Sequence, residues 1–393
     1  MATVSPVDEP EKRKSCVTVQ SRINFTKIGE IDTKNEKFAA EAYIECTWYD
    51  DSILKKFIEI NFSDSNMDFL NDLNETKIKF LHSILKKIQY DPELFWSPEI
   101  YVENSIGSPK EYFTYKFDLV LTDKQAADSI DSYIVRITEK RRVEGFFYER
   151  LELNDFPIDL QELSIKLTSK KSVDEVILVE CKSEKSGVNI ECFADQQQWD
   201  LFDCVKITKN SFDDKWKKYV RSEFKVTCLV VRKYGFYLWN AFLLVFLITV
   251  LGFTIFSISP TTPQFRCQVT GLLLLTSINF RWIVTQRLPS VSYLTLLDKY
   301  TIGCLIYLVL FCVWHAIIGS ESIISNIELK RDVDFYFLIG SAITFIVFHL
   351  GFIFWFIRKI IEIKHLKEAI FNHSHNETNG NHIHTSDTNI ELE

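Results

Sequence analysis

The sequence has few residues that interrupt or cross-link a fold, and it lacks the motifs of common catalytic classes. Its 393 residues include only 12 Gly and 9 Pro, and no linker rich in either. No GxSxG, no HExxH and no phosphate-binding glycine loop occurs, so we expect neither an enzyme nor a cofactor. The absence of a CxxC pair argues against a zinc site. The net charge of −8 argues against a nucleic-acid partner.

Long apolar segments, in contrast, fill the second half of the chain. Residues 234–257 and 335–357 carry no charge, and residues 294–319 carry none after Lys299. Each exceeds the roughly 20 residues that a helix needs to cross about 30 Å of hydrocarbon. Buried helices of a soluble protein can be equally apolar, but three such segments close together favour a membrane protein.

A fourth segment, residues 264–287, is shorter in its apolar part and more polar. At helical spacing, one of its faces collects Gln264, Gln268, Leu272, Leu275, Asn279, Trp282 and Gln286. We call this set the polar stripe. Lipid cannot satisfy amide groups, so the stripe must face protein or water. Around a symmetry axis it would line a pore that its leucine rings close by dewetting; alternatively, it packs against the other three helices.

Residues 1–232 are typical of a β-rich domain. Strand-like runs, separated by clusters of Asp, Asn, Ser and Lys, occur at 16–31, 38–49, 115–121, 133–137, 145–153, 162–168, 175–180, 199–208 and 219–231. Their number and spacing predict an antiparallel, immunoglobulin-like all-β sandwich. Residues 77–88 have helical periodicity and predict one short surface helix.

Cysteines and glycosylation sites bear on the location of the chain. Cys181 and Cys192 flank a polar turn and are candidates for a hairpin disulfide, although the sequence does not fix the pairing of its nine cysteines. Asn-x-Ser/Thr sites lie outside the apolar segments, at Asn24, Asn61, Asn74, Asn372 and Asn376. Four spans place both termini on one side. We therefore expect a multi-pass plasma-membrane protein whose N-terminal domain and polar tail, residues 361–393, are extracellular. The amphipathic stretch at 359–370 is expected to extend the fourth span as a helix.

Short motifs resemble those of one family. Trp96-Ser97-Pro98-Glu99 resembles the WxPD/E motif of pentameric ligand-gated ion channels, the Cys-loop receptor superfamily. Residues 156–161, FPIDLQ, resemble that family's FPFDxQ, Trp48 matches an early tryptophan, and residues 287–300 resemble the link between its second and third helices. The resemblance implies an extracellular β-sandwich, a four-helix transmembrane domain over residues 233–360, and a homopentamer around a central pore in the lipid bilayer.

The chain also departs from the family pattern. The two positions of the family's disulfide hold Glu149 and Leu163. The loop is therefore present without its bridge, as in the family's prokaryotic branch. Packing of Phe156 and Pro157 must then hold the loop between them. The link between the third and fourth spans, residues 320–334, is too short for a folded cytoplasmic domain.

The resemblance assigns residues to the junction between the sandwich and the helices. Asp32, Asp159 and Arg232 match an acid–acid–base cluster there, which would couple the two parts strongly because a half-dry interface makes its charges interdependent. Phe156 and Pro157 belong to the same coupling region, and Pro289 is expected to stiffen the outer end of the pore helix. The alternative is that Asp32, Asp159 and Arg232 are three ordinary surface charges.

For the pore, the resemblance places Leu275 at the family's central leucine gate. Leu272 lies one turn inward, and Trp282 offers a second constriction near the mouth. The inner mouth lacks the glutamate ring of cation channels, and Arg266 would favour anions if it faced water. By analogy with the disulfide-less branch, we expect cations to permeate.

The family's ligand site lies between subunits and is lined by aromatic rings. Tyr43 matches one such position, and Trp216 or Tyr219 would cap the site from the hairpin at 210–222. Glu103 and Lys170 stand where rings are expected, and a lysine repels an ammonium ion. A carboxylate, an amphiphile or protons then remain as ligands; alternatively, the aromatic residues only pack and the site is degenerate.

Two functional hypotheses follow. The first is a channel that an extracellular ligand opens. The second is a non-conducting membrane receptor that keeps the fold, because the leucine belt is doubled and a charged ring is missing. His315 and His349, within the third and fourth spans, are expected to be hydrogen-bonded between helices rather than to sense protons.

Overall fold

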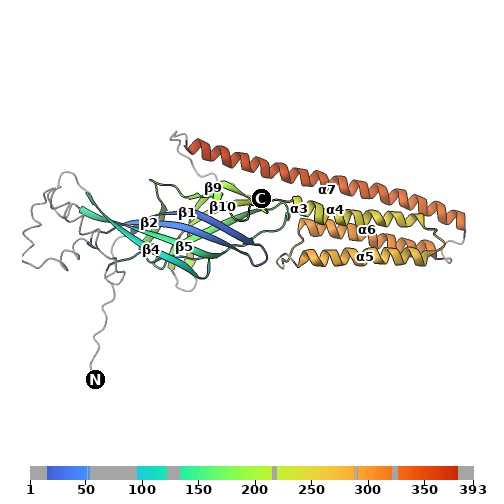
Figure 1. Cartoon of the computed structure of the whole chain (residues 1–393), viewed down its shortest axis with the longest axis horizontal. Helices are drawn as coiled ribbons and strands as arrows, with labels where there is room; N and C mark the ends of the chain where they lie inside the picture. The colour runs from blue at the N-terminus through green and yellow to red at the C-terminus, as the bar shows by residue number, and fades with distance from the viewer. Residues whose placement is uncertain are drawn as a thin grey trace, which may run out of the picture.

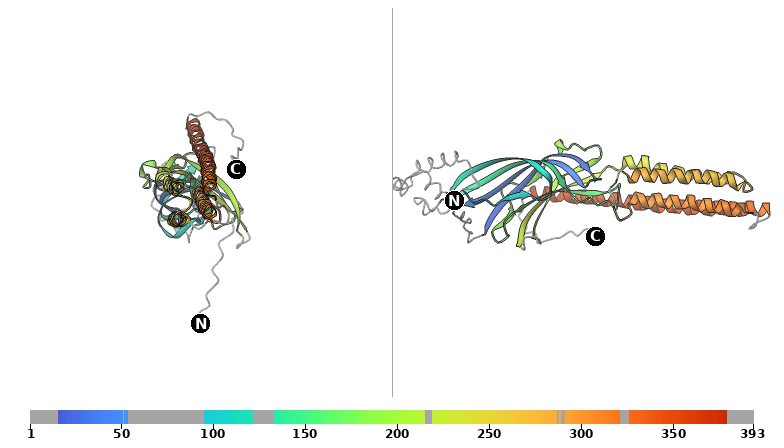
Figure 2. Two further views of the ribbon diagram at one scale, coloured as in Figure 1. Left: turned by 90° about the vertical axis from the view of Figure 1, so that its right-hand side faces the viewer. Right: turned by 90° about the horizontal axis from the view of Figure 1, so that it is seen from below.

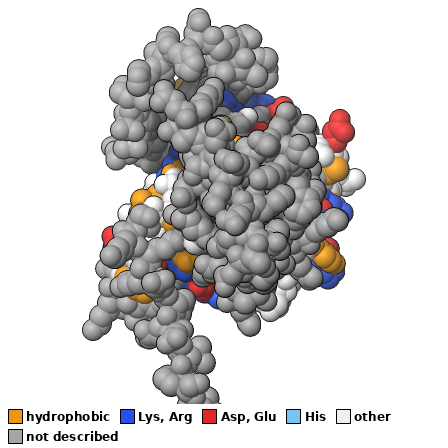
Figure 3. All heavy atoms as spheres, turned by 90° about the vertical axis from the view of Figure 1, so that its left-hand side faces the viewer, with side chains coloured by type: hydrophobic (Ala, Val, Ile, Leu, Met, Phe, Trp, Pro, Cys, Tyr) orange, Lys and Arg blue, Asp and Glu red, His pale blue; other side chains and the backbone are white. Residues whose placement is uncertain are grey.

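The computed structural model describes residues 16–50, 52–53, 95–121, 133–214, 219–286, 288, 291–320 and 326–378. A β-rich part and a helical part lie end to end along the long axis (Figure 1). At the free end of the β-rich part, the described side chains include both signs of charge and apolar groups (Figure 3). The expected helix at 77–88, Trp216 and Pro289 lie outside the described residues.

Two sheets form the β-rich part. The first contains β1 (Val17–Asp32), β2 (Lys37–Asp50), β4 (Ser105–Leu121), β5 (Tyr133–Tyr148), β7 (Val176–Glu180) and β8 (Gly187–Val188), in the order β4-β5-β2-β1-β7 with β8 also on β1. The second contains β3 (Ile100–Val102), β6 (Leu160–Ser169), β9 (Trp199–Asp214) and β10 (Tyr219–Arg232), in the order β3-β6-β10-β9. A 3-10 turn, η4 (Ile190–Cys192), precedes β9.

Alternating side chains build the core between the sheets. Along β2, every second residue from Phe38 to Trp48 is buried, as the two-residue period of a strand requires. These residues form one apolar core with Phe224 and Val226 of the other sheet. The sandwich therefore has its own core, separate from the helices.

Two expectations about the strands are wrong. The runs at 133–137 and 145–153 are one strand, β5, which ends at Tyr148. Its polar middle stays in the strand because Glu139 and Arg141 form a 2.7 Å ion pair whose side chains are each only 5% exposed. In addition, the sandwich is not wholly antiparallel, since β1 pairs in parallel with both β7 and β8.

No hairpin disulfide forms between Cys181 and Cys192. All nine cysteines are free thiols. Cys181 lies 3.2 Å from the Ser183 hydroxyl, and Cys192 accepts a hydrogen bond from the Asn189 side chain. The polar turn is thus stabilised without sulfur cross-linking.

Among the described residues, four helical segments that follow the sandwich are long and apolar enough to cross a membrane. The first combines α3 (Gly235–Tyr237), the π-helical turn η5 (Leu238–Phe242), α4 (Leu243–Thr254) and the 3-10 turn η6 (Ile255–Ser257). The others are α5 (Pro263–Thr285), α6 (Leu296–Gly319) and α7 (Ile327–Thr378). A capping box fixes the start of α6, because Thr295 and Asp298 each bond the other's backbone N–H.

Helix α7 is much longer than the predicted fourth span at 335–357. No glycine or proline occurs from residue 352 to its end, so nothing in the sequence breaks it there. It runs along the outside of the other helices and continues past the junction to the side of β9 (Figures 1 and 2). There, Lys367 Nζ lies 5.6 Å from the centroid of the Phe202 ring.

Candidate functional site

An ion pair lies where the sandwich meets the helices. Arg232, the last residue of β10, donates from Nε to Asp159 Oδ1 at 2.8 Å and from Nη2 to Asp159 Oδ2 at 3.1 Å. Its guanidinium carbon is 4.0 Å from the ring centroid of Trp199 and 4.9 Å from that of Phe156. Both charged side chains are buried. The result is a buried, bidentate ion pair whose guanidinium also contacts two aromatic rings.

The β5–β6 loop that contains Asp159 also contacts the helices directly. Phe156 and Pro157 are buried within it. Its contacts with the helical part are Leu153 N to Tyr293 Oη at 2.9 Å, Leu296 N to Asn154 O at 3.0 Å, Leu297 N to Phe156 O at 3.3 Å, the Phe156–Tyr237 ring contact at 4.7 Å and Lys359 Nζ to Asp155 Oδ2 at 3.0 Å. The loop is therefore attached to the first span, to the start of α6 and to α7.

Asp32 is not part of this junction cluster. Its carboxylate accepts hydrogen bonds from the Asn35 backbone N at 3.1 Å and from Asn35 Nδ2 at 2.7 Å, and it lies 3.8 Å from Lys37 Nζ. These contacts close the β1–β2 turn, as aspartate commonly does. The expected triad is thus a pair, because the turn satisfies Asp32 locally.

A polar clasp closes the β5–β6 loop at its base, at the place where the resemblance puts a disulfide. Ser164 donates from its backbone N to Glu149 Oε2 at 3.0 Å, and its hydroxyl donates to the same oxygen. Asn104 Nδ2 donates to Ser164 O at 2.7 Å and to Tyr148 O at 3.0 Å. Burial raises the pKa of the Glu149 carboxyl, although the Ser164 bonds oppose the rise. Leu163, the other disulfide position, is buried in the core.

The polar stripe lies on the exposed face of α5. All seven of its residues are exposed in the chain: among them, Leu272 is 64%, Leu275 56% and Trp282 65% exposed. The buried residues of α5 are Arg266, Thr270 and Ser277, which lie on the opposite side at 100° per residue. The stripe is therefore not packed against the other helices of the same chain.

Arg266 and the two helical histidines face the interior of the bundle. Arg266 is fully buried and lies 2.8 Å from Asp334 of α7. His315 Nδ1 is 3.4 Å from Arg266 Nη1, and His349 Nε2 is 3.2 Å from Tyr300 Oη. Both histidines make the expected interhelical contact, but His315 Nε2 is buried without a hydrogen-bond partner among the described residues.

The residues assigned to the ligand site divide between the two sheets. Glu103, Lys170 and Tyr219 belong to the second sheet and its connections, where Tyr219 Oη donates to Lys170 O at 2.6 Å. Burial and the neighbouring Glu223 raise the pKa of Glu103. Tyr43 is on β2 of the first sheet, where it pairs with Arg142. One chain therefore does not bring Tyr43 to the other three.

Sequence reasoning missed Arg221, near the start of β10 and two residues after Tyr219. Its guanidinium donates to Tyr101 Oη and lies 5.9 Å and 5.8 Å from the ring centroids of Phe212 and Tyr219. We call these four residues the Arg221 cage. Rings around a cation are the usual protein site for a cationic ligand, so the chain's own guanidinium already fills that place. The alternation of residues 219 and 221 on one strand face was the available signal.

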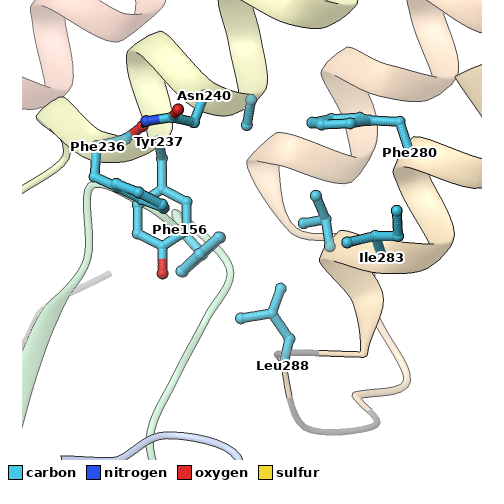
Figure 4. Close-up of a pocket in the computed structure, with 9 residues that line it drawn as sticks. Phe156, Phe236, Tyr237, Asn240, Phe280, Ile283 and Leu288 are labelled. Atoms are coloured by element: carbon cyan, nitrogen blue, oxygen red, sulfur yellow. The ribbon is translucent and has the colours of Figure 1, made fainter.

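A cavity of about 160 Å³ separates the junction loop from α5. Phe156 and Tyr237 line one side, and Phe280 and Ile283 of α5 line the other (Figure 4). Because Phe156 faces this space, the loop has room to move towards α5. Within the described ranges, no cluster of three His, Cys, Asp or Glu side chains is placed to hold a metal ion.

Comparison with known proteins relates both halves of the chain to receptors. A family model described as the neurotransmitter-gated ion-channel ligand binding domain matches residues 2–234. The acetylcholine receptor subunit epsilon of Bos taurus is 21% identical over 333 residues, which cover 83% of this chain and 59% of the relative. The gamma-aminobutyric acid receptor subunit beta-like of Drosophila melanogaster is 20% identical over 287 residues, covering 72% and 52%. The chain therefore matches little more than half the length of these relatives.

Proposed function

The chain belongs to the neurotransmitter-gated ion-channel family, and we propose that it is one subunit of a homopentamer whose pore opens when a small molecule binds to the β-rich domain. The four apolar helices fit a membrane-embedded part, and the relatives are receptor subunits rather than enzymes. The ligand binds between adjacent subunits, which would bring Tyr43 of one subunit to the second sheet of its neighbour.

The exposed polar stripe carries this proposal. A long, half-polar helix face that its own chain leaves uncovered has to be covered by water or by other copies, because lipid cannot satisfy its amides. Five copies arranged around an axis turn the stripe to a shared water column. Rings of Leu272 and Leu275 then form the dry constriction that closes the pore.

The junction supplies the path from ligand to pore. β10 carries Arg221 at one end and Arg232 at the other. A displacement of β10 moves Arg232 and, through the paired Asp159, the loop that contacts Leu296 and Leu297 at the start of α6. The cavity beside Phe156 gives that loop space to move. The coupling residues are thus Phe156, Pro157, Asp159 and Arg232, with Pro289 proposed from the resemblance alone.

We place the chain in the plasma membrane with both the β-rich domain and the C-terminal tail outside. Support comes from α7, whose Lys359 and Lys367 contact Asp155 and Phe202 of the β-rich domain. The end of α7 is therefore on the same side as the sandwich. The permeant ions are cations, by analogy with the disulfide-less branch.

The ligand is not a simple ammonium ion. Arg221 already lies within about 6 Å of the ring centroids of Phe212 and Tyr219, and a second cation there would meet its charge. Lys170 adds a further positive charge at the end of β6. The cage therefore excludes the ligand type that an empty aromatic box favours.

Recording from purified protein in planar bilayers tests the channel proposal. Leu275→Ser wets the constriction and is expected to give a pore that opens without ligand. Ile278→Ser is the matched control, because Ile278 is a similarly exposed apolar residue of α5 outside the polar stripe. If Leu275→Ser protein passes no current, the channel proposal is wrong, and the non-conducting receptor, which the doubled leucine belt favours, replaces it.

A further inference from the structure

The end of the helical part farthest from the sandwich contains a charged cluster that the pore proposal does not use. Arg266, in the first turn of α5, reaches Asp334 of α7 with Nη2 at 2.8 Å from Oδ2. Its Nε donates to Ile258 O at 2.8 Å, and its Nη2 also donates to Phe256 O at 3.2 Å. One guanidinium thus holds the α4–α5 connection, α5 and α7 together.

Helix α6 completes the cluster. Trp314 Nε1 donates to the other Asp334 oxygen, Oδ1, at 2.9 Å, and the Trp314 ring stacks on Phe337 at 4.0 Å. His315 Nδ1 lies 3.4 Å from Arg266 Nη1. The Arg266 side chain is 0% exposed and that of Asp334 8%. A charge buried this far from water is tolerated only with its partner in place.

The helices also meet closely at this end. A Cβ atom added to Gly319, the last residue of α6, would clash with Cβ of Pro263, the first residue of α5. The start of α5 is therefore held by contact as well as by charge. It cannot turn about its axis without breaking the Arg266–Asp334 pair.

The direction of Arg266 decides what its charge can do. Arg266 is on the buried side of α5, opposite the exposed stripe that begins at Gln264. The stripe itself contains only amide, leucine and tryptophan side chains. The basic group in the first turn of α5 is thus neutralised by Asp334 inside the bundle and is not presented to the stripe.

We propose that Arg266 and Asp334 are positioning residues that fix the orientation of the pore helix at its inner end, and that Arg266 takes no part in selecting the sign of the permeant ion. This inference rests on the proposed channel function. It means that selectivity arises without a charged ring on α5. Removing the pair changes how readily the pore opens, but not which ions pass.

The test uses recordings in the Leu275→Ser background, where no ligand is needed. Arg266→Gln is expected to keep the sodium-to-chloride permeability ratio of the background while changing the open probability on the order of tenfold, the usual size of such couplings. Asp334→Asn is expected to change it at least as much, because it leaves the guanidinium buried without a counter-ion. Trp314→Phe keeps the stacked ring but removes one donor to Asp334, so a smaller change of the same sign is expected.

The double variant Arg266→Gln/Asp334→Asn separates pairing from simple damage. Two neutral partners can still hydrogen-bond. The double variant is therefore expected to reverse most of the change in open probability caused by Asp334→Asn, and to regain most of the thermal stability that Asp334→Asn loses. Arg281→Gln is the control for charge removal from α5, since Arg281 is partly exposed and 3.7 Å from Asp298.

Several results would overturn the inference. A permeability ratio that shifts in Arg266→Gln would show that the guanidinium does select ions. A double variant no better than Asp334→Asn, in either current or thermal stability, would show that the two residues do not act as a pair. Silence of the Leu275→Ser background itself would refute the channel proposal instead, and the thermal-stability comparison would still decide whether the pair holds the helices.

Discussion

Truncating Arg232 at the junction should cost far more stability than removing an arginine from the surface. Arg232→Ala deletes both hydrogen bonds to Asp159 and both ring contacts, with Trp199 and Phe156. Asp159 is 2% exposed, so water cannot replace the guanidinium. The side-chain donor that stays is Gln161 Nε2, at 2.6 Å from Asp159 Oδ2.

Breaking a buried pair by removing one partner costs about 3–5 kcal/mol. A domain of about 150–250 residues loses roughly 2–4 °C in melting temperature per kcal/mol, so Arg232→Ala should melt roughly 6–20 °C lower than the unchanged protein. Arg232→Lys keeps the charge but cannot reach both carboxylate oxygens. It should lose one charge-assisted hydrogen bond, worth about 1.5–3 kcal/mol, and melt at an intermediate temperature.

The assay is thermal unfolding of the full chain in detergent, with circular dichroism used to monitor the β-rich part. Arg142→Ala serves as control, because Arg142 also pairs with a carboxylate at 2.8 Å but is more than half exposed, and exposed pairs contribute little. If Arg232→Ala melts no lower than Arg142→Ala, or if Arg232→Lys equals Arg232→Ala, the junction is not the dry bidentate pair described above.

Three further predictions concern other parts of the chain. The folded pKa of Glu149 is raised above its ordinary value of 4.5, so the stability that its neutral carboxyl contributes is complete below pH 4.5 and is lost as the pH rises through the raised pKa. Glu149→Gln should flatten this pH dependence in denaturation curves and be at least as stable as the unchanged chain at pH 7. A steeper pH dependence in the variant would contradict the assignment. Arg221→Ala empties the Arg221 cage, so tetramethylammonium should raise the melting temperature of this variant but not of the unchanged chain or of Lys170→Ala; equal shifts in all three would show that the cage is not the binding place. Gly319→Ala should lower the free energy of unfolding by about 1–3 kcal/mol through its clash with Pro263. Gly340→Ala, where a Cβ meets nothing within 4 Å, should raise the free energy of unfolding by up to about 1 kcal/mol. The reverse order would disprove the close approach of Gly319 to Pro263.

Much of the helical part could be predicted because membrane spans are set by apolar length. The spans at 234–257, 264–287 and 294–319 differ from the observed helices by two residues or fewer at each end. The fourth helix, Ile327–Thr378, continues past the apolar stretch at 335–357, as the amphipathic residues after Arg358 predicted, and it also begins earlier than hydropathy alone indicated. Periodicity alone also found the exposed side of α5.

The sequence was less informative where polar groups satisfy one another in the fold. The charged middle of β5 was predicted to separate two strands. Nothing in the linear pattern shows that Glu139 and Arg141 neutralise each other inside the sandwich. Asp32 was assigned to the junction by the family resemblance, but its carboxylate accepts hydrogen bonds from Asn35 in the β1–β2 turn. The family resemblance predicts aromatic residues at the ligand face but no cation beside their rings, so it did not point to Arg221.

The polar clasp has a consequence for how the chain can be made and handled. Its links from Glu149 and Asn104 to Ser164 consist of oxygen and nitrogen only, so thiol reductants such as dithiothreitol have nothing to cleave there. Maturation of this loop needs no oxidising compartment and no disulfide isomerase. A reducing cytosol should therefore yield a β-rich domain as well formed as one made by secretion.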